Sequence, residues 1–175
     1  MKNLLLGFVV AFSFVSMPVQ ATEPQELKNP LFEALSELCG KKFKGKVTES
    51  NDSDETWRKS KIVIYVKDCN ENEIRIPLSV GKDTSRTWIF TLTGKGFDLT
   101  FKHDHRHEDG TPDEITMYGG TTGLFGFMED FNAYIVPFQA DDFSKAMFLE
   151  HGLDESVQNT WTISIIPGEL LIYSL

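Results

Sequence analysis

Hydrophobic and polar residues alternate along most of the chain after residue 40, as they do in β-strands with one buried face. In Glu73–Val80 every even position is apolar, and in Arg86–Thr93 the apolar row is Trp88, Phe90 and Leu92. Similar segments are Phe43–Thr48, Lys61–Lys67, Phe97–His107, Glu114–Tyr118, Asn132–Phe138, Asn159–Ile166 and Leu170–Leu175. Clusters of Asn, Asp and Gly separate them, so the pattern predicts about nine short antiparallel strands.

Two segments have helical spacing instead. Pro30 opens a short helix in which apolar residues recur from Leu31 to Leu38, until Gly40 ends it. Asp141–His151 is compatible with a short helix or with a strand. A short N-terminal helix followed by about nine strands predicts an all-β fold, an antiparallel lipocalin-like β-barrel, with a β-sandwich as the alternative.

The first residues have the pattern of a signal peptide. Lys2 precedes the apolar run Leu4–Val15, and small residues at Val19 and Ala21 flank Gln20 at the expected cleavage site. We therefore expect residues 1–21 to be removed and residues 22–175 to form a single domain. The apolar run is shorter than a membrane anchor. The prediction is an exported protein, periplasmic or secreted, with no membrane anchor.

Charge narrows the range of partners. The chain has 26 acidic and 17 basic residues and a formal net charge of −9. An acidic surface repels phosphate backbones, so nucleic acid is not an expected partner, and anionic membrane surfaces are disfavoured for the same reason.

Cys39 and Cys69 are the two cysteines of the chain. Export would place them in a compartment where disulfides persist, and the sequence has no Cys-x-x-Cys motif. We expect them to form a structural disulfide.

The candidate functional site lies at the end of the segment Phe97–His107. His103, His105 and His107 occupy the same alternate positions as Phe97, so they are expected on the core face, at one end of the barrel. Alternate strand residues are about 6.6 Å apart, and two such histidines can share a divalent transition metal such as zinc. Hydrogen bonding of the histidines to Asp104, Asp109 or the backbone is the structural alternative.

Arg86 falls in the same inward row as Trp88. Its guanidinium is expected to lie over the indole as a structural cap of the barrel end. The alternative is an anchor for a ligand carboxylate or phosphate, because an inward arginine is costly unless it is paired.

The segment Gly119–Gly126 is rich in glycine, but it lacks the Lys-Ser/Thr ending and the βαβ context of a phosphate-binding loop. A flexible loop at the barrel mouth is the expected structure.

Four segments carry a resemblance to a known family: Ile74–Gly81, Ser85–Trp88, Lys102–Gly110 and Thr116–Gly120. With their signature SRTW, HDHRHEDG and TMYGG, they resemble a family of exported bacterial proteins to which no activity is assigned. The resemblance covers most of the chain after residue 21 and implies export and a calycin-like barrel, but no catalytic residues. Members of that family continue into a further basic strand after the region of Tyr173, so the resemblance alone does not predict a closed barrel here.

These features predict an exported barrel that binds a small molecule at a histidine-lined end, which is also the candidate metal site. The expected ligand-binding residues are Arg86, Trp88, His103, His105 and His107. One alternative is a metal-assisted hydrolase or lyase, in which the histidines hold the metal and Glu108 or Asp104 is the general base. The other alternative is a non-catalytic structural or interaction protein of the cell envelope.

Overall fold

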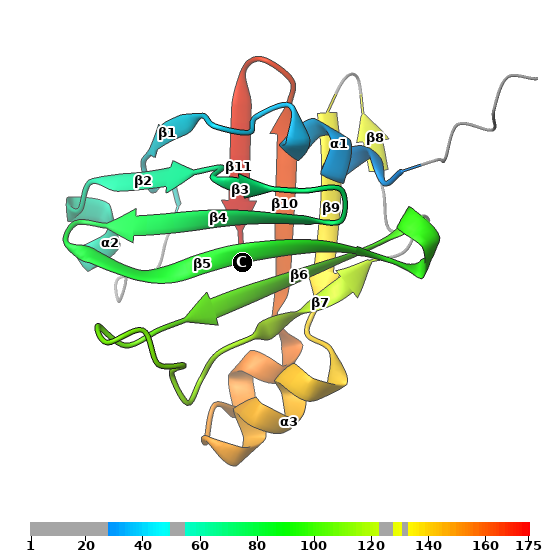
Figure 1. Cartoon of the computed structure of the whole chain (residues 1–175). Helices are drawn as coiled ribbons and strands as arrows, with labels where there is room; N and C mark the ends of the chain where they lie inside the picture. Colours follow the sequence, from blue (N-terminus) through cyan, green and yellow to red (C-terminus); the bar gives the residue numbers. More distant parts are fainter. Residues whose placement is uncertain (1–27, 50–54, 123–127, 131–132) are drawn as a thin grey trace, which may run out of the picture.

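The structure is a computed structural model that describes residues 28–49, 55–122, 128–130 and 133–175. The expected signal peptide, residues 1–21, lies outside the described residues. Two antiparallel sheets form the molecule, and Figure 1 shows the smaller sheet crossing behind the larger one at a steep angle. The alternation of apolar residues therefore led to the correct class, a mostly antiparallel β-fold.

The larger sheet has seven strands, which lie between residues 42 and 122. Its strands follow the order β1 (Lys42–Gly45), β2 (Ile62–Tyr65), β4 (Glu73–Val80), β5 (Asp83–Thr93), β6 (Asp98–His105) and β7 (Tyr118–Thr122). The short strand β3 (Asp68–Cys69) pairs with β4. All of these pairings are antiparallel.

The smaller sheet has four strands, in the order β11 (Leu170–Ser174), β10 (Thr160–Ile166), β9 (Ala133–Gln139) and β8 (Met128–Asp130). Three α-helices flank the sheets: α1 (Pro30–Ser36), α2 (Glu55–Lys59) and α3 (Asp142–Glu150). Short 3-10 helices lie at Gly94–Gly96 and Asp154–Gln158. The ambiguous segment after Asp141 is thus helical, and no helix of the described ranges is long and apolar enough to cross a membrane.

The core lies between the two sheets. Phe90 of β5 stacks on Phe101 of β6 with ring centroids 4.6 Å apart, and Phe101 in turn contacts Phe138 of β9 at 5.3 Å. The inward residues of both sheets are buried, as the parity of the sequence predicts, and Leu31, Phe32 and Leu35 of α1 join the same cluster. Asn29 caps α1 by accepting hydrogen bonds from the first backbone N–H groups of the helix.

The sheets meet most closely where β7 passes β9. A Cβ atom on Gly120 would lie 1.8 Å from the carbonyl oxygen of Gln139, so only glycine fits there. The expected flexible loop at Gly119–Gly126 is therefore wrong for residues 119–122, which form β7, while residues 123–126 lie outside the described residues. Glycine at position 120 therefore allows the backbones of β7 and β9 to approach each other closely.

Two further expectations differ from the structure. No closed barrel is found in the described part of the chain, where the strands form two separate antiparallel sheets and β1 and β11 each pair on one side only. The expected strand at Glu114–Tyr118 is also wrong, since the Asp113 carboxylate accepts from the Ile115 N–H, the Thr116 hydroxyl accepts from the His105 N–H of β6, and β7 begins only at Tyr118.

The disulfide between Cys39 and Cys69 is confirmed. It joins the segment after α1 to β3, so it fastens the N-terminal helix to the larger sheet. A disulfide of this kind is typical of an oxidising, extracytoplasmic compartment.

Candidate functional site

His103 lies in the core, where β6 directs it inward opposite Trp88 of β5. Its Nδ1–H donates to the backbone carbonyl of Tyr118 at 3.3 Å, and the Tyr173 hydroxyl donates to its Nε2 at 3.1 Å. Burial lowers the pKa of His103 to about 3, so the imidazole is neutral at ordinary pH. Both ring nitrogens have partners within the protein.

Aromatic rings from both sheets enclose this imidazole. The nearest ring centroids are those of Phe101 at 4.5 Å, Tyr118 at 4.6 Å and Trp161 at 5.1 Å. Tyr118 lies almost parallel to the imidazole, with 17° between the planes. His103 is thus a hydrogen-bonded part of the core, as the structural alternative to a metal ligand predicts.

His105 lies at the end of β6 and is half-buried. Its Nε2 is 3.0 Å from the Tyr118 hydroxyl, and its backbone N–H donates to the Thr116 hydroxyl at 2.7 Å. Burial, and then the positive charge of Arg86 on the neighbouring strand, lower the pKa of His105. Burial also raises the pKa of Tyr118 to about 12. His105, Tyr118 and Arg86 therefore form a polar cluster at one end of the core.

Arg86 contacts different partners from those that the sequence suggested. Its guanidinium forms an ion pair with Asp83 and lies 5.4 Å from the ring centroid of Trp57 in α2. Trp88, the expected aromatic partner, stacks instead on Tyr173 of β11, with centroids 4.8 Å apart. Trp57 is not predictable from strand alternation, although a lone tryptophan in a charged segment is a signal that it packs against another element.

His107 lies away from the other two histidines. The strand β6 ends at His105, and the chain then turns, with the His107 N–H donating to the carbonyl of Thr111 and the Gly110 N–H donating to that of His107. The side chain of His107 is exposed. The expected row of three inward histidines is therefore wrong at its last member, because β6 ends at His105 and the turn at residues 108–110 follows His107 directly.

A shared metal ion does not fit this geometry. In the described ranges, no group of three or more His, Cys, Asp or Glu side chains is placed to hold one. His103 already uses both ring nitrogens, and His107 lies outside the strand. His105 remains as a single candidate ligand, which is too few for a protein-bound zinc site.

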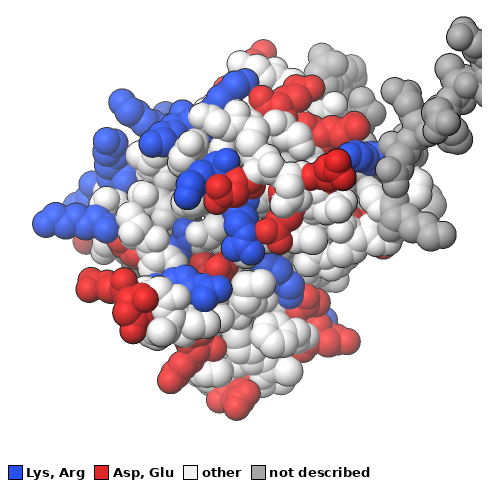
Figure 2. Space-filling view, viewed as in Figure 1, with Lys and Arg blue, Asp and Glu red and all other residues white. Residues whose placement is uncertain are grey.

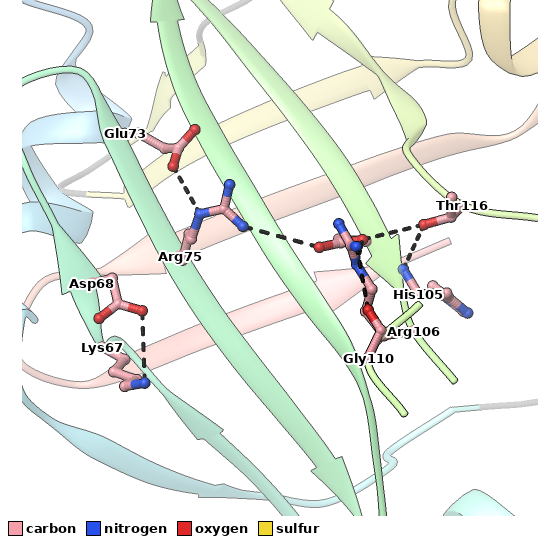
Figure 3. Close-up of polar contacts among 9 residues, drawn as sticks. Lys67, Asp68, Glu73, Arg75, His105, Arg106, Gly110 and Thr116 are labelled. Carbon is pink, nitrogen blue, oxygen red and sulfur yellow. Dashed lines mark hydrogen bonds and ion pairs between the residues drawn. The ribbon is translucent and has the colours of Figure 1, made fainter. Parts of the chain in front are cut away.

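A second polar cluster lies on the outer face of the larger sheet (Figure 3). Asp104 is buried there, and its Oδ1 accepts hydrogen bonds from Arg106 Nε at 2.8 Å and the Thr116 hydroxyl at 3.3 Å. Arg75 Nη1 is 3.9 Å from the other oxygen and pairs through its Nε with Glu73 at 2.8 Å. The sequence signal for this cluster was the set of charged residues at outward positions of β4 and β6.

The two carboxylates proposed as general bases, Asp104 and Glu108, lie apart from His103. Asp104 lies on the opposite face of the sheet from His103, because neighbouring strand residues point to opposite sides. Glu108 is exposed in the turn. Neither carboxylate is placed to act together with His103.

The surface of the described residues has shallow hollows, among them one of about 280 Å³ and one of about 430 Å³. The first lies beside α3 and is lined in part by Gln139, Lys145 and Leu149. The second lies beside α1 and the turn that follows β3. None of the five predicted ligand-binding residues lines either hollow.

Comparisons with known protein families, with curated proteins and with solved structures find no match. The resemblance to exported bacterial proteins therefore stays a prediction from the sequence signature.

Proposed function

We propose that the protein is an exported, non-catalytic domain of the bacterial cell envelope that works by binding a macromolecule. The observation that carries this proposal is the filled space between the sheets. A carrier of small molecules needs an apolar cavity of several hundred Å³, and here that position is taken by large side chains. Those that are fully buried include Phe90, Phe101, Phe138 and Trp161.

Export is part of this proposal. It is supported by the signal-peptide pattern of residues 1–21 and by the disulfide between Cys39 and Cys69. The net charge of −9 favours partners that are not polyanions.

Native mass spectrometry of the protein purified from its own compartment tests the proposal. We expect the mass of residues 22–175 with one disulfide and no retained organic molecule or metal. Cross-linking of intact cells before purification should add a covalent adduct larger than the chain itself. A stoichiometric small molecule that leaves only on denaturation would contradict the proposal and favour a carrier.

The polar cluster supports a second candidate function, the binding of a small anion. Arg86 lies opposite His105 on β5 and β6, and the Tyr118 hydroxyl is 3.0 Å from His105 Nε2, so a carboxylate or phosphate here would compete with Asp83 for the Arg86 guanidinium and would accept a hydrogen bond from the Tyr118 hydroxyl. Such a ligand would reach the end of the core and would not need an internal cavity.

This second candidate is tested by NMR titration of the His105 ring with acetate and with inorganic phosphate. A bound anion offsets the positive charge of Arg86, so we expect the pKa of His105 to rise as the ligand binds. The rise should disappear in Arg86→Gln and persist in the control Arg106→Gln, which changes an arginine of the outer face. An unchanged His105 titration at millimolar anion would exclude the site.

A further inference from the structure

Basic residues are concentrated at the edge of the larger sheet formed by β1 and β2. Residues 38–48 and 56–67 contain no Asp or Glu, although the chain has 26 acidic and 17 basic residues. The basic residues of these two segments are Lys41, Lys42, Lys44, Lys46, Arg58, Lys59, Lys61 and Lys67. Figure 2 shows Lys and Arg side chains gathered on the side of the molecule where β1 and β2 lie. An acidic molecule thus has a local basic surface.

The four lysines of β1 and its flanks, which we call the lysine edge, are all exposed: Lys41, Lys42, Lys44 and Lys46. In the described ranges, none of them has a carboxylate within ion-pair distance, and Lys42 Nζ lies 4.6 Å from the ring centroid of Tyr65. Several cations elsewhere are paired, as in Arg75–Glu73, Arg86–Asp83, Lys102–Asp141 and Arg106–Asp104. Lysines in a row repel one another, so an anionic partner would stabilise the lysine edge.

The free backbone groups of β1 belong to two of the same lysines. The Val66 N–H of the segment that follows β2 donates to the carbonyl of Lys41, and directly opposed residues of an antiparallel pair bond in this way at every second position. Phe43 therefore directs its N–H and C=O groups to β2, while Lys42 and Lys44 direct theirs to the free side of β1. No strand among the described residues pairs with that side. Positive charge and hydrogen-bonding capacity coincide at these two residues.

We propose that the lysine edge binds a protein partner that adds an acidic strand to β1. Carboxylates at alternate positions of such a strand would face Lys42 and Lys44, because side chains alternate with the same period in both strands. The backbone of the added strand would complete the hydrogen bonds at the free side of β1. This inference rests on the proposed function, since it names the class of macromolecule that is bound.

Charge favours this occupant over the alternatives. Two β1 strands that paired with each other would bring lysine close to lysine, and lysines on an edge also hinder the addition of uncharged strands. A long polyanion or an anionic membrane would extend beyond the lysine edge over a molecule whose net charge is −9. A short acidic strand contacts the lysine edge alone, since exposed charges more than about 8 Å away are largely screened at physiological salt.

NMR titration of the exported chain with a short capped peptide, in which glutamate alternates with threonine, tests the inference. We expect saturable binding that weakens as NaCl is raised. Lys42→Gln/Lys44→Gln should weaken it about tenfold, because two cross-strand charge pairs are lost. The matched control is Lys28→Gln/Lys145→Gln, which removes the same charge before α1 and in α3 and should bind the peptide as the wild type does.

A charge swap separates loss of the interface from loss of the fold. Lys42→Glu/Lys44→Glu should lose the glutamate peptide and bind the corresponding peptide of alternating lysine and threonine. Both residues are exposed, so the fold should persist in each variant. A swapped variant that binds neither peptide although its urea midpoint is unchanged overturns the proposal.

Amide hydrogen exchange distinguishes strand addition from attraction between charges alone. The bound peptide should protect the N–H groups of Lys42 and Lys44 and leave those of Phe43 and Gly45, which already face β2, unchanged. A peptide with the same charges, but N-methylated at alternate amides so that it cannot donate to β1, should bind more weakly. Equal binding of the methylated peptide, or protection that does not alternate, overturns the strand.

Two further ligands test the other anionic occupants. Tighter binding of polygalacturonate, or of vesicles that contain phosphatidylglycerol, would assign the lysine edge to a glycan or to a membrane and overturn the proposal. Failure of the glutamate peptide to bind, while cross-linking of intact cells still yields a macromolecular adduct, overturns this inference and leaves the proposed function standing. Absence of the adduct as well contradicts both.

Discussion

At the centre of the core, His103 is held in its neutral form by its surroundings. Its imidazole has a carbonyl acceptor on one side and a hydroxyl donor on the other, and aromatic rings exclude water. An apolar side chain could fill the same space but could not satisfy the Tyr173 hydroxyl, which is buried with it. The histidine is thus part of the packing that joins β6 to β11.

This environment makes stability depend on pH. The folded-state pKa of His103, about 3, lies below the ordinary value of 6.5. Between these two values His103 is protonated in the unfolded chain but neutral in the folded chain. The free energy of unfolding should fall as pH is lowered through 6.5, by about 2 kcal/mol between pH 7.5 and pH 5 for one such group. Urea denaturation at the two pH values measures this, and His103→Gln should lose most of the difference. The exposed His107→Gln should keep the wild-type difference; equal pH dependence in all three proteins would contradict burial of a neutral His103.

The two sheets can approach closely at Gly120 because glycine has no side chain. In Gly120→Ala the new Cβ would meet the carbonyl oxygen of Gln139, and a backbone atom cannot move aside cheaply. We expect a loss of about 1 to 3 kcal/mol in the free energy of unfolding, as for overpacked cores. Gly45→Ala in β1 is the control, because its Cβ would meet only the Ile62 side chain, at 3.3 Å. Comparable midpoints for the two variants in urea would show that β7 and β9 do not touch.

At the scale of elements, α1 is attached to the fold by burial and by one covalent bond. Leu31, Phe32 and Leu35 are buried, and the Cys39–Cys69 disulfide ties the segment after the helix to β3. A helix of seven residues is too short to be stable alone. Its attachment to the sheets is what keeps it folded.

Removal of the disulfide should therefore be costly. The bond joins residues 30 apart, and closure of a loop of that size contributes about 3 to 4 kcal/mol in the chain-entropy model. We expect Cys39→Ser/Cys69→Ser to lose about that amount in urea denaturation under oxidising conditions. A reducing agent should destabilise the wild type and leave the double variant unaffected. Identical curves for both proteins without reductant would mean that the bond contributes nothing.

At the scale of the whole molecule, local pattern and long-range contact were predictable to different degrees. Short-range rules give the parity of Trp88 and Phe90 and the helix opened by Pro30. The cysteine pair follows because the chain has two cysteines, and the structure confirms all three. The meeting of β7 with β9 does not, because the carbonyl that crowds Gly120 belongs to Gln139, in the other sheet. The alternation of apolar and polar residues within one segment does not predict a contact with a strand of the other sheet.

In the candidate site, too, the sequence predicts local features but not long-range contacts. Inward placement of His103 follows from alternation with Phe101, but the partners that fix its role, Tyr118 and Tyr173, come from strands 15 and 70 residues away. His107 was misplaced because alternation carries no information on where a strand ends. The turn that diverts it depends on hydrogen bonds around Gly110 and Thr111.

The central claim is that the space between the two sheets is filled, and xenon binding followed by NMR tests it most directly. Xenon enters dry apolar cavities and shifts the methyl resonances that line them. We expect no saturable shift at the buried methyl groups of Leu99, Val136 and Ile163, while the enlarged space in Phe138→Leu should produce one at the same residues. A saturable shift of those methyl groups in the wild-type protein would reveal a cavity and contradict the account.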